Sequence, residues 1–224
     1  MAAREGASVE AREALASLCA DYWYPLYAFV RRRGHDVSAA EDLVQGFFTR
    51  LLEKGDLAAV DHRKGRFRSF LLASCSHYLS NSADLQRAAK RGGGCAIIAL
   101  NRLDAQKRYA HEPSHDLTAD RLFERQWALT VLERVIGRLD AEMAEAGKST
   151  LFDALRPALL GEGGRAPYAA IAARLGMTEE AARAAATRLR RRYRQLLRVE
   201  VAGTLGDPDD LDDEIRELFN ALAG

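Results

Sequence analysis

Cysteine, proline and long apolar runs are all scarce in this sequence, and each scarcity excludes a class of protein. The 3 cysteines, Cys19, Cys75 and Cys95, stand far apart without the paired spacing of a disulfide framework or a zinc site, which predicts buried, reduced thiols. No apolar run approaches the roughly 18 residues of a membrane span, and the N-terminus lacks the apolar core of a signal peptide. We therefore expect a soluble, intracellular protein with no membrane insertion.

Strand signals are also missing, and this absence decides the expected fold class. The chain contains only 5 prolines and is rich in alanine and leucine, which favours helix along most of its length. No run of alternating β-branched and polar residues is long enough to indicate a sheet. The sequence therefore predicts an all-α protein, and its 224 residues allow one large or two small domains.

The net charge of +1 conceals a strong separation of charge along the chain. Seven arginines crowd the segment 183–198, at Arg183, Arg188, Arg190, Arg191, Arg192, Arg194 and Arg198. Seven acids follow at Asp207, Asp209, Asp210, Asp212, Asp213, Glu214 and Glu217. No acid occurs between Glu180 and Glu200, so these arginines are predicted to have no local i,i+4 partner. An unneutralised arginine run on a helix is what phosphate binding requires.

The segment that carries these arginines has the pattern of a helix-turn-helix. A short helix is predicted over Tyr168–Leu175, with Ile171 and Leu175 on one face. Gly176 supplies a left-handed residue to end it, and Thr178 is a suitable N-cap for the second helix. A basic helix alone is usually only a solvated surface, but the preceding helix, glycine turn and cap favour DNA binding.

Two helical blocks flank a mixed middle segment, 96–118, which reads as a linker. In the first block, Ser38 and Glu41 form a capping-box pair that predicts the start of a helix with an apolar face at Val44, Phe47, Phe48 and Leu51. A further helix is expected from Phe67 to about Leu79, and another around Ala83–Lys90.

Three patterns, in this order, resemble the extracytoplasmic-function sigma factors of bacteria. The first is Ala40, Glu41, Asp42, Leu43, Val44 and Gln45, followed by Phe47, Phe48 and Leu51. The second is Phe67, Arg68, Ser69, Phe70 and Leu71, which leads to Arg87, Lys90 and Arg91. The third is the helix-turn-helix, and the Lys-Arg-Gly-Gly-Gly ending of the first block with the acidic tail is similar to a planctomycete-type subgroup.

The resemblance implies two small helical domains and a transcription function rather than an enzyme. They are a sigma region two-like domain at 1–95, the linker at 96–118, a sigma region four-like helix-turn-helix domain at 119–200, and an acidic tail at 201–224. Such a protein binds core RNA polymerase and promoter DNA in the cytoplasm, at the nucleoid, without a cofactor, metal or catalytic residue. It implies a regulatory partner as well, either an anti-sigma factor or a Ser/Thr kinase.

The resemblance also assigns site residues. Polymerase docking falls to Glu41, Asp42 and Gln45, although Glu41 is equally suited to close the capping box. The resemblance implies a loop over Leu79–Asp84 that captures a flipped base of the −10 element. Contact with this element falls to Tyr78, Ser80, Asn81, Asp84, Arg87, Lys90 and Arg91. Contact with the −35 element falls to Thr178, Arg183, Thr187, Arg188, Arg191 and Arg192.

Other interpretations remain open. A stand-alone helix-turn-helix regulator would explain the second block but not the patterns of the first. His111, Glu112 and His115 spell the HExxH string of zinc hydrolases, but Pro113 would break the helix that this chemistry needs. The acidic tail could fold back on the arginines of 183–198 and mask them, or serve only as a solvated tail.

Overall fold

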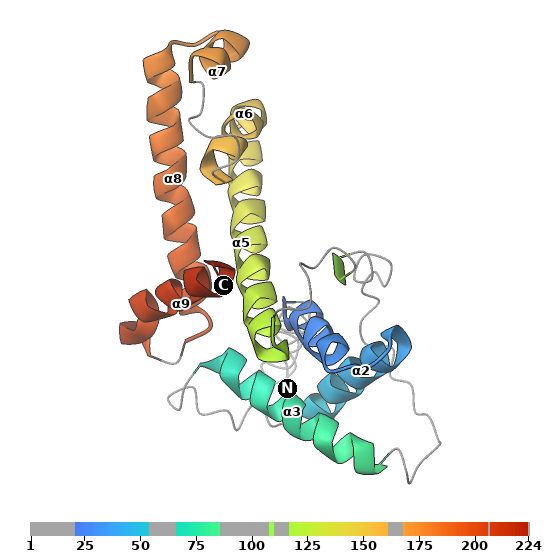
Figure 1. Ribbon diagram of the computed structural model, residues 1–224. Helices are drawn as coiled ribbons and strands as arrows, with labels where there is room; N and C mark the ends of the chain where they lie inside the picture. Colours follow the sequence, from blue (N-terminus) through green and yellow to red (C-terminus); the bar gives the residue numbers. More distant parts are fainter. Residues whose placement is uncertain are drawn as a thin grey trace, which may run out of the picture. The chain divides into compact units, whose positions relative to one another are not determined.

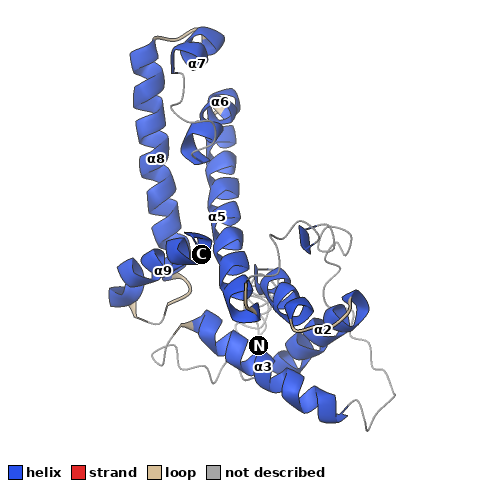
Figure 2. Cartoon of the chain, viewed as in Figure 1, coloured by secondary structure: helices blue, strands red, loops and turns tan. Residues whose placement is uncertain are grey.

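The computed structural model describes residues 21–53, 66–85, 108–109, 117–160, 168–205 and 207–223. These residues form helices and no strand, so the predicted all-α class is confirmed for this part of the chain (Figures 1 and 2). After a helix that includes residues 21–32, the elements are α2 (Val37–Glu53), α3 (Phe67–Leu85), α5 (Ala119–Glu145), α6 (Ser149–Leu160), α7 (Tyr168–Leu175), α8 (Glu179–Ala202), the 3₁₀ turn η2 (Pro208–Asp210) and α9 (Leu211–Ala223). Among the described helices, none is both long and apolar enough to span a bilayer.

The chain divides into two compact units. Unit 1 comprises Met1–Thr130 together with Thr204–Gly224, and unit 2 comprises Val131–Gly203. The boundaries differ from the predicted segments, because α5 contributes to both units and the acidic C-terminal segment belongs to unit 1. The predicted linker, 96–118, lies almost entirely outside the described residues.

Aromatic side chains build the core of unit 1. The helix over 21–32 buries Tyr22 and Phe29 along with the rest of its aromatic stretch. Tyr22 meets Phe67 of α3 edge to face at 5.6 Å between ring centroids, and Phe29 meets Phe123 of α5 at 6.5 Å. Such edge-to-face pairs add to the free energy gained from burying the rings. Segments far apart in the sequence therefore share one core.

The start of α2 differs from the predicted capping box. Asp36 caps the helix, because its side-chain Oδ1 accepts a hydrogen bond from the Ala39 amide at 2.8 Å. Ser38 lies inside the first turn instead, and Glu41 is buried, with 7% of its surface exposed. The predicted apolar face is confirmed, since Val44, Phe47, Phe48 and Leu51 are all buried.

The predicted loop over Leu79–Asp84 is wrong, because α3 runs without a break from Phe67 to Leu85. Polar side chains that favour loops are accommodated here by bonds to the preceding turn. Ser80 Oγ donates to the Ser76 carbonyl at 3.0 Å, and the Asn81 amide lies 3.2 Å from His77 Nδ1. Leu71, Cys75 and Leu79 supply the buried face of this long helix.

The cysteine prediction is confirmed for the one thiol that the structure describes. Cys75 is free and 1% exposed on α3, and burial raises its pKa to about 12. Cys19 and Cys95 lie outside the described residues.

In unit 2 the helices α6, α7 and α8 pack against one another. Phe152 and Leu155 of α6 are buried, as are Leu196 and Leu197 in the C-terminal half of α8. The short helix α7 packs against both α6 and α8, and these contacts hold it in place beside α8.

Candidate nucleic-acid interface

Helix α7 ends in the turn that the sequence predicts. Gly176 adopts φ +65°, a left-handed conformation that suits glycine, and the Met177 amide donates to the Ala172 carbonyl at 3.0 Å. Thr178 then caps α8, since its Oγ1 accepts from the Ala181 amide at 3.1 Å. The described geometry is a helix, a tight glycine turn and a capped second helix.

The alanines of α8 let the two helices approach closely. Ala182, Ala185 and Ala186 are buried, and Ile171 and Ala172 of α7 are buried as well. A small side chain at each close approach permits contact without a bulky residue between the helix backbones. Ala184 is exposed on the outer surface of α8, so no base-reading group stands at this position.

The prediction that the arginines have no local partner is wrong for Arg183. Glu179 precedes it by four residues, and Arg183 Nη2 lies 2.5 Å from Glu179 Oε1. Two hydrogen bonds to Glu179 raise the pKa of Arg183 further above its usual range. Its guanidinium also lies 5.5 Å from the ring centroid of Tyr168. Arg183 is still largely exposed, but its charge is locally balanced.

Other helices of unit 2 supply further partners for the arginines of α8. Arg192 forms a two-pronged pair with Glu142 of α5, with N–O distances of 2.7 and 2.6 Å. These hydrogen bonds hold the pKa of Glu142 below its usual range. Arg190 donates to the Tyr168 hydroxyl at 3.0 Å and to the Ala158 carbonyl at 3.3 Å. Arg190 and Arg192 therefore lie at the flanks of α8 and stabilise unit 2.

Three arginines of α8 lie outward and meet no acid among the described residues of unit 2. Arg188, Arg191 and Arg194 are exposed. Their spacing of three residues places them along one side of the helix, facing away from the buried Ala182. We call these three residues the arginine ridge. Arg194 was absent from the predicted contacts, although its spacing of three from Arg191 could have revealed it.

Thr187 is exposed next to the ridge, and its hydroxyl donates back to the Arg183 carbonyl at 3.0 Å. Its Oγ1 lone pairs are still available to accept a hydrogen bond. Of the six predicted −35 residues, Thr178 is used for the cap, Arg183 and Arg192 are paired, and Thr187, Arg188 and Arg191 present surface.

The predicted docking residues of unit 1 differ in accessibility. Glu41 is buried and Gln45 is half-buried, whereas Asp42 is exposed. The three residues share α2, but they do not form one open acidic face. Of the three predicted docking residues, a partner could reach Asp42 and the exposed part of Gln45.

The predicted −10 residues lie on α3 as far as the structure describes them. Ser80 and Asn81 are exposed, each bonded to the preceding turn. The ring of Tyr78 is half-buried and lies 5.9 Å from that of Phe47, and burial raises the pKa of its hydroxyl. Asp84 belongs to α3, and its side chain is not described. Arg87, Lys90 and Arg91 lie outside the described residues.

The described residues contain no group of three or more His, Cys, Asp or Glu side chains suited to a metal ion. The HExxH string at 111–115 lies outside those residues. Comparison with protein-family models, curated proteins and solved structures gives no match to this chain. The geometry of the site is therefore the basis for a functional proposal.

Proposed function

We propose that this chain is a transcription initiation factor similar to the extracytoplasmic-function sigma factors, which binds core RNA polymerase and directs it to promoter DNA. The observation that carries this proposal is the arginine ridge, Arg188, Arg191 and Arg194, on the second helix of a capped helix-turn-helix. Glu179 pairs with Arg183 and Glu142 pairs with Arg192, whereas the three arginines of the ridge are exposed and meet no acid among the described residues of unit 2.

The chemistry of the ridge fits a DNA backbone. Guanidinium groups bind phosphate oxygens in pairs, and each phosphate contact adds to the dependence of affinity on salt. A recognition helix of this type reads bases from its N-terminal part while its later residues meet the backbone. After the exposed pair of Glu179 and Arg183, the next exposed polar residues along α8 are Thr187 and Arg188, so sequence discrimination at a −35 element would depend on few side chains.

Polymerase docking and −10 recognition are assigned to unit 1 in this proposal. The supporting observations are the signature patterns of the sequence and the exposure of Asp42 on α2. Ser80 and Asn81 on α3 offer polar groups to a DNA strand. We expect a cytoplasmic protein that is regulated by an anti-sigma factor or a Ser/Thr kinase.

The first test is binding of the full chain to core RNA polymerase. Asp42→Lys should weaken binding at least tenfold, because it reverses an exposed charge on α2 without disturbing the core. Asp153→Lys, an equal change at an exposed position of α6, should bind like the wild type. Glu41 is left unchanged in this test, since it is buried and a lysine there would perturb the fold. Equal affinity of all three proteins, or none for the wild type, would refute the docking assignment.

The second test concerns the ridge. Replacement of both Arg188 and Arg191 with alanine should abolish promoter footprints of the polymerase complex upstream at the −35 element. If the wild type footprints DNA alone and ignores polymerase, the chain is instead a stand-alone helix-turn-helix regulator. Full footprints from the double variant would refute the ridge as a DNA contact.

A further inference from the structure

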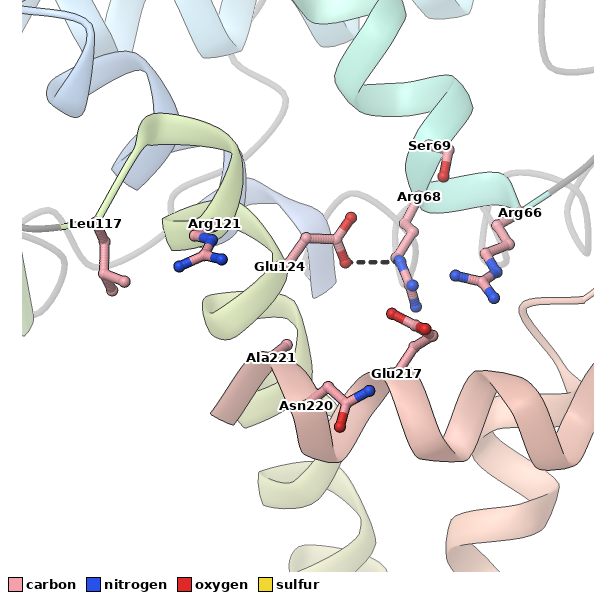
Figure 3. Close-up of a pocket in the computed structure, with 9 residues that line it drawn as sticks. All are labelled: Arg66, Arg68, Ser69, Leu117, Arg121, Glu124, Glu217, Asn220 and Ala221. Carbon is pink, nitrogen blue, oxygen red and sulfur yellow. Dashed lines mark ion pairs between the residues drawn. The ribbon is translucent and has the colours of Figure 1, made fainter. Parts of the chain in front are cut away.

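The C-terminal helix α9 inserts a carboxylate into the interior of unit 1. Glu214 is 1% exposed, and its carboxylate pairs with Arg68 Nη1 and, at 2.8 Å, with Arg66 Nε. Arg68 is 4% exposed and also pairs through Nε with Glu124 of α5 at 2.7 Å (Figure 3). Its guanidinium lies 4.2 Å from the ring centroid of Trp127. The acidic segment thus contributes to unit 1 a buried ion cluster, made of Arg66, Arg68, Glu124 and Glu214.

This cluster holds α9 without a large gain in free energy. Arg68 Nε and Glu214 Oε2 are both buried, and neither makes a hydrogen bond of good geometry to another described group. A buried ion pair repays its desolvation only when such bonds are complete. Burial raises the pKa of Glu214 even though Arg68 and Arg66 oppose the shift. Desolvation therefore offsets much of the attraction between Glu214 and the two arginines, but loss of the carboxylate charge would leave the buried Arg68 with less compensation.

The apolar contribution of α9 depends mainly on one side chain. Leu218 is fully buried, Leu211, Ile215 and Leu222 are half-buried, and Phe219 is 49% exposed. Burial of one leucine is worth about 2 kcal/mol. A helix of 13 residues has little stability by itself in water. Unit 1 meanwhile has its main core in other helices, around Tyr27, Phe47 and Phe123.

A cavity of about 340 Å³ lies along the edge of α9. Its lining residues include Arg66, which precedes α3, Arg68 of α3, Glu124 of α5, and Glu217 and Asn220 of α9 (Figure 3). Arg66 is 34% exposed, so water and competing groups reach one member of the cluster. The surface on which α9 packs is therefore accessible to solvent along this cavity.

We propose that α9 is a releasable latch of unit 1, with Glu214 as its ionic lock, which opens while the rest of the unit remains folded. Opening removes Glu214 from Arg66 and from Arg68, which belongs to the signature pattern at the start of α3. Any effect of this opening on promoter recognition rests on the proposed function, whereas the opening itself does not.

Hydrogen–deuterium exchange of the full chain, resolved by peptide, tests the latch without polymerase or DNA. In the wild type the amides of α9 should exchange at least tenfold faster than those of α2. Glu214→Gln should accelerate exchange in α9 by a further tenfold or more and leave α2 unchanged. Glu217→Gln, the same chemical change on an exposed residue of the same helix, should exchange like the wild type.

Leu218→Ala provides a second route to the open state, because it removes the apolar anchor and leaves every charge in place. It should produce the same local exchange pattern as Glu214→Gln. Equal protection of α9 and α2 in the wild type would overturn the proposal. The proposal would also be overturned if the amides of α9 exchanged at the same rate in Glu214→Gln and Glu217→Gln. Faster exchange throughout unit 1 in either Glu214→Gln or Leu218→Ala would overturn it as well.

Discussion

Gly46 of α2 lies directly under the hydroxyl of Tyr78 of α3. This contact predicts that Gly46→Ala destabilises the protein when the hydroxyl is present and stabilises it when the hydroxyl is removed. A Cβ added at Gly46 would lie 2.4 Å from Tyr78 Oη, whereas ordinary contact begins at 3.4 Å. The aromatic ring is rigid and half-buried against Phe47, so it cannot simply turn aside. Gly46→Ala must therefore push the ring or the helix by about 1 Å.

The magnitude is the difference between two opposing effects. Overpacking of this kind costs about 1–3 kcal/mol. Alanine is better than glycine inside a helix by roughly 0.8–1.0 kcal/mol. We expect Gly46→Ala to lower the free energy of unfolding by about 0–2 kcal/mol on balance. In a Tyr78→Phe background the ring atom nearest the added Cβ is Cζ at 3.5 Å, which is an ordinary contact. In that background Gly46→Ala should therefore raise the free energy of unfolding by up to about 1 kcal/mol.

Urea unfolding followed by circular dichroism measures this double-mutant cycle. Gly137→Ala in α5 is the matched control, because nothing lies within 4 Å of a Cβ at that position. It should stabilise the protein by roughly 1 kcal/mol in either background. If Gly46→Ala has the same effect with Tyr78 and with Phe at that position, the contact does not constrain α2 and α3 and the reasoning fails.

Three further predictions follow from unit 2 and from α3. Glu142→Gln should release Arg192 and strengthen binding of duplex DNA, and the slope of log K against log salt should become steeper by about 1. Glu145→Gln, at an exposed position of the same helix, should change neither the affinity nor the slope. An unchanged slope for Glu142→Gln would show that Arg192 is not available to phosphate. Thr178→Ala should cost about 1 kcal/mol in thermal unfolding through loss of the cap, and Thr178→Ser should restore it; equal melting of both variants would contradict the cap. Burial raises the pKa of Cys75 from 9.0 to about 12, so at pH 8 alkylation of this thiol should be about a thousandfold slower in the native protein than after unfolding. Peptide mapping measures the two rates, and rapid labelling of the native protein would contradict the burial of Cys75.

Local sequence was sufficient for the helix-turn-helix because its signals act over a few residues. Gly176 ends α7 through its positive φ, and Thr178 caps α8 through a bond to an amide three residues on. The apolar face of α2 likewise followed from spacing alone, as Val44 and Phe47 illustrate. These features depend on backbone sterics and helical period, which the sequence carries directly.

Local reasoning failed where two local choices were nearly equal in free energy. Ser38 and Asp36 are both good caps, and the structure uses Asp36. Ser80 and Asn81 favour loops as readily as they bond to a preceding turn, and the buried face of α3 decides for helix. Neither outcome could be read from residue type, because packing of the whole helix tips the balance.

The sequence by itself therefore determined an all-helical chain and the position of a capped helix rich in arginine. Only the tertiary structure decided which arginines present their charge to a ligand. Glu142 is fifty residues from Arg192 in the sequence, yet their carboxylate and guanidinium are paired. Glu214 pairs with Arg68 across a still longer separation, so that the acidic segment belongs to unit 1. Charge acts through space, and the order of residues along a chain does not state which charges will meet.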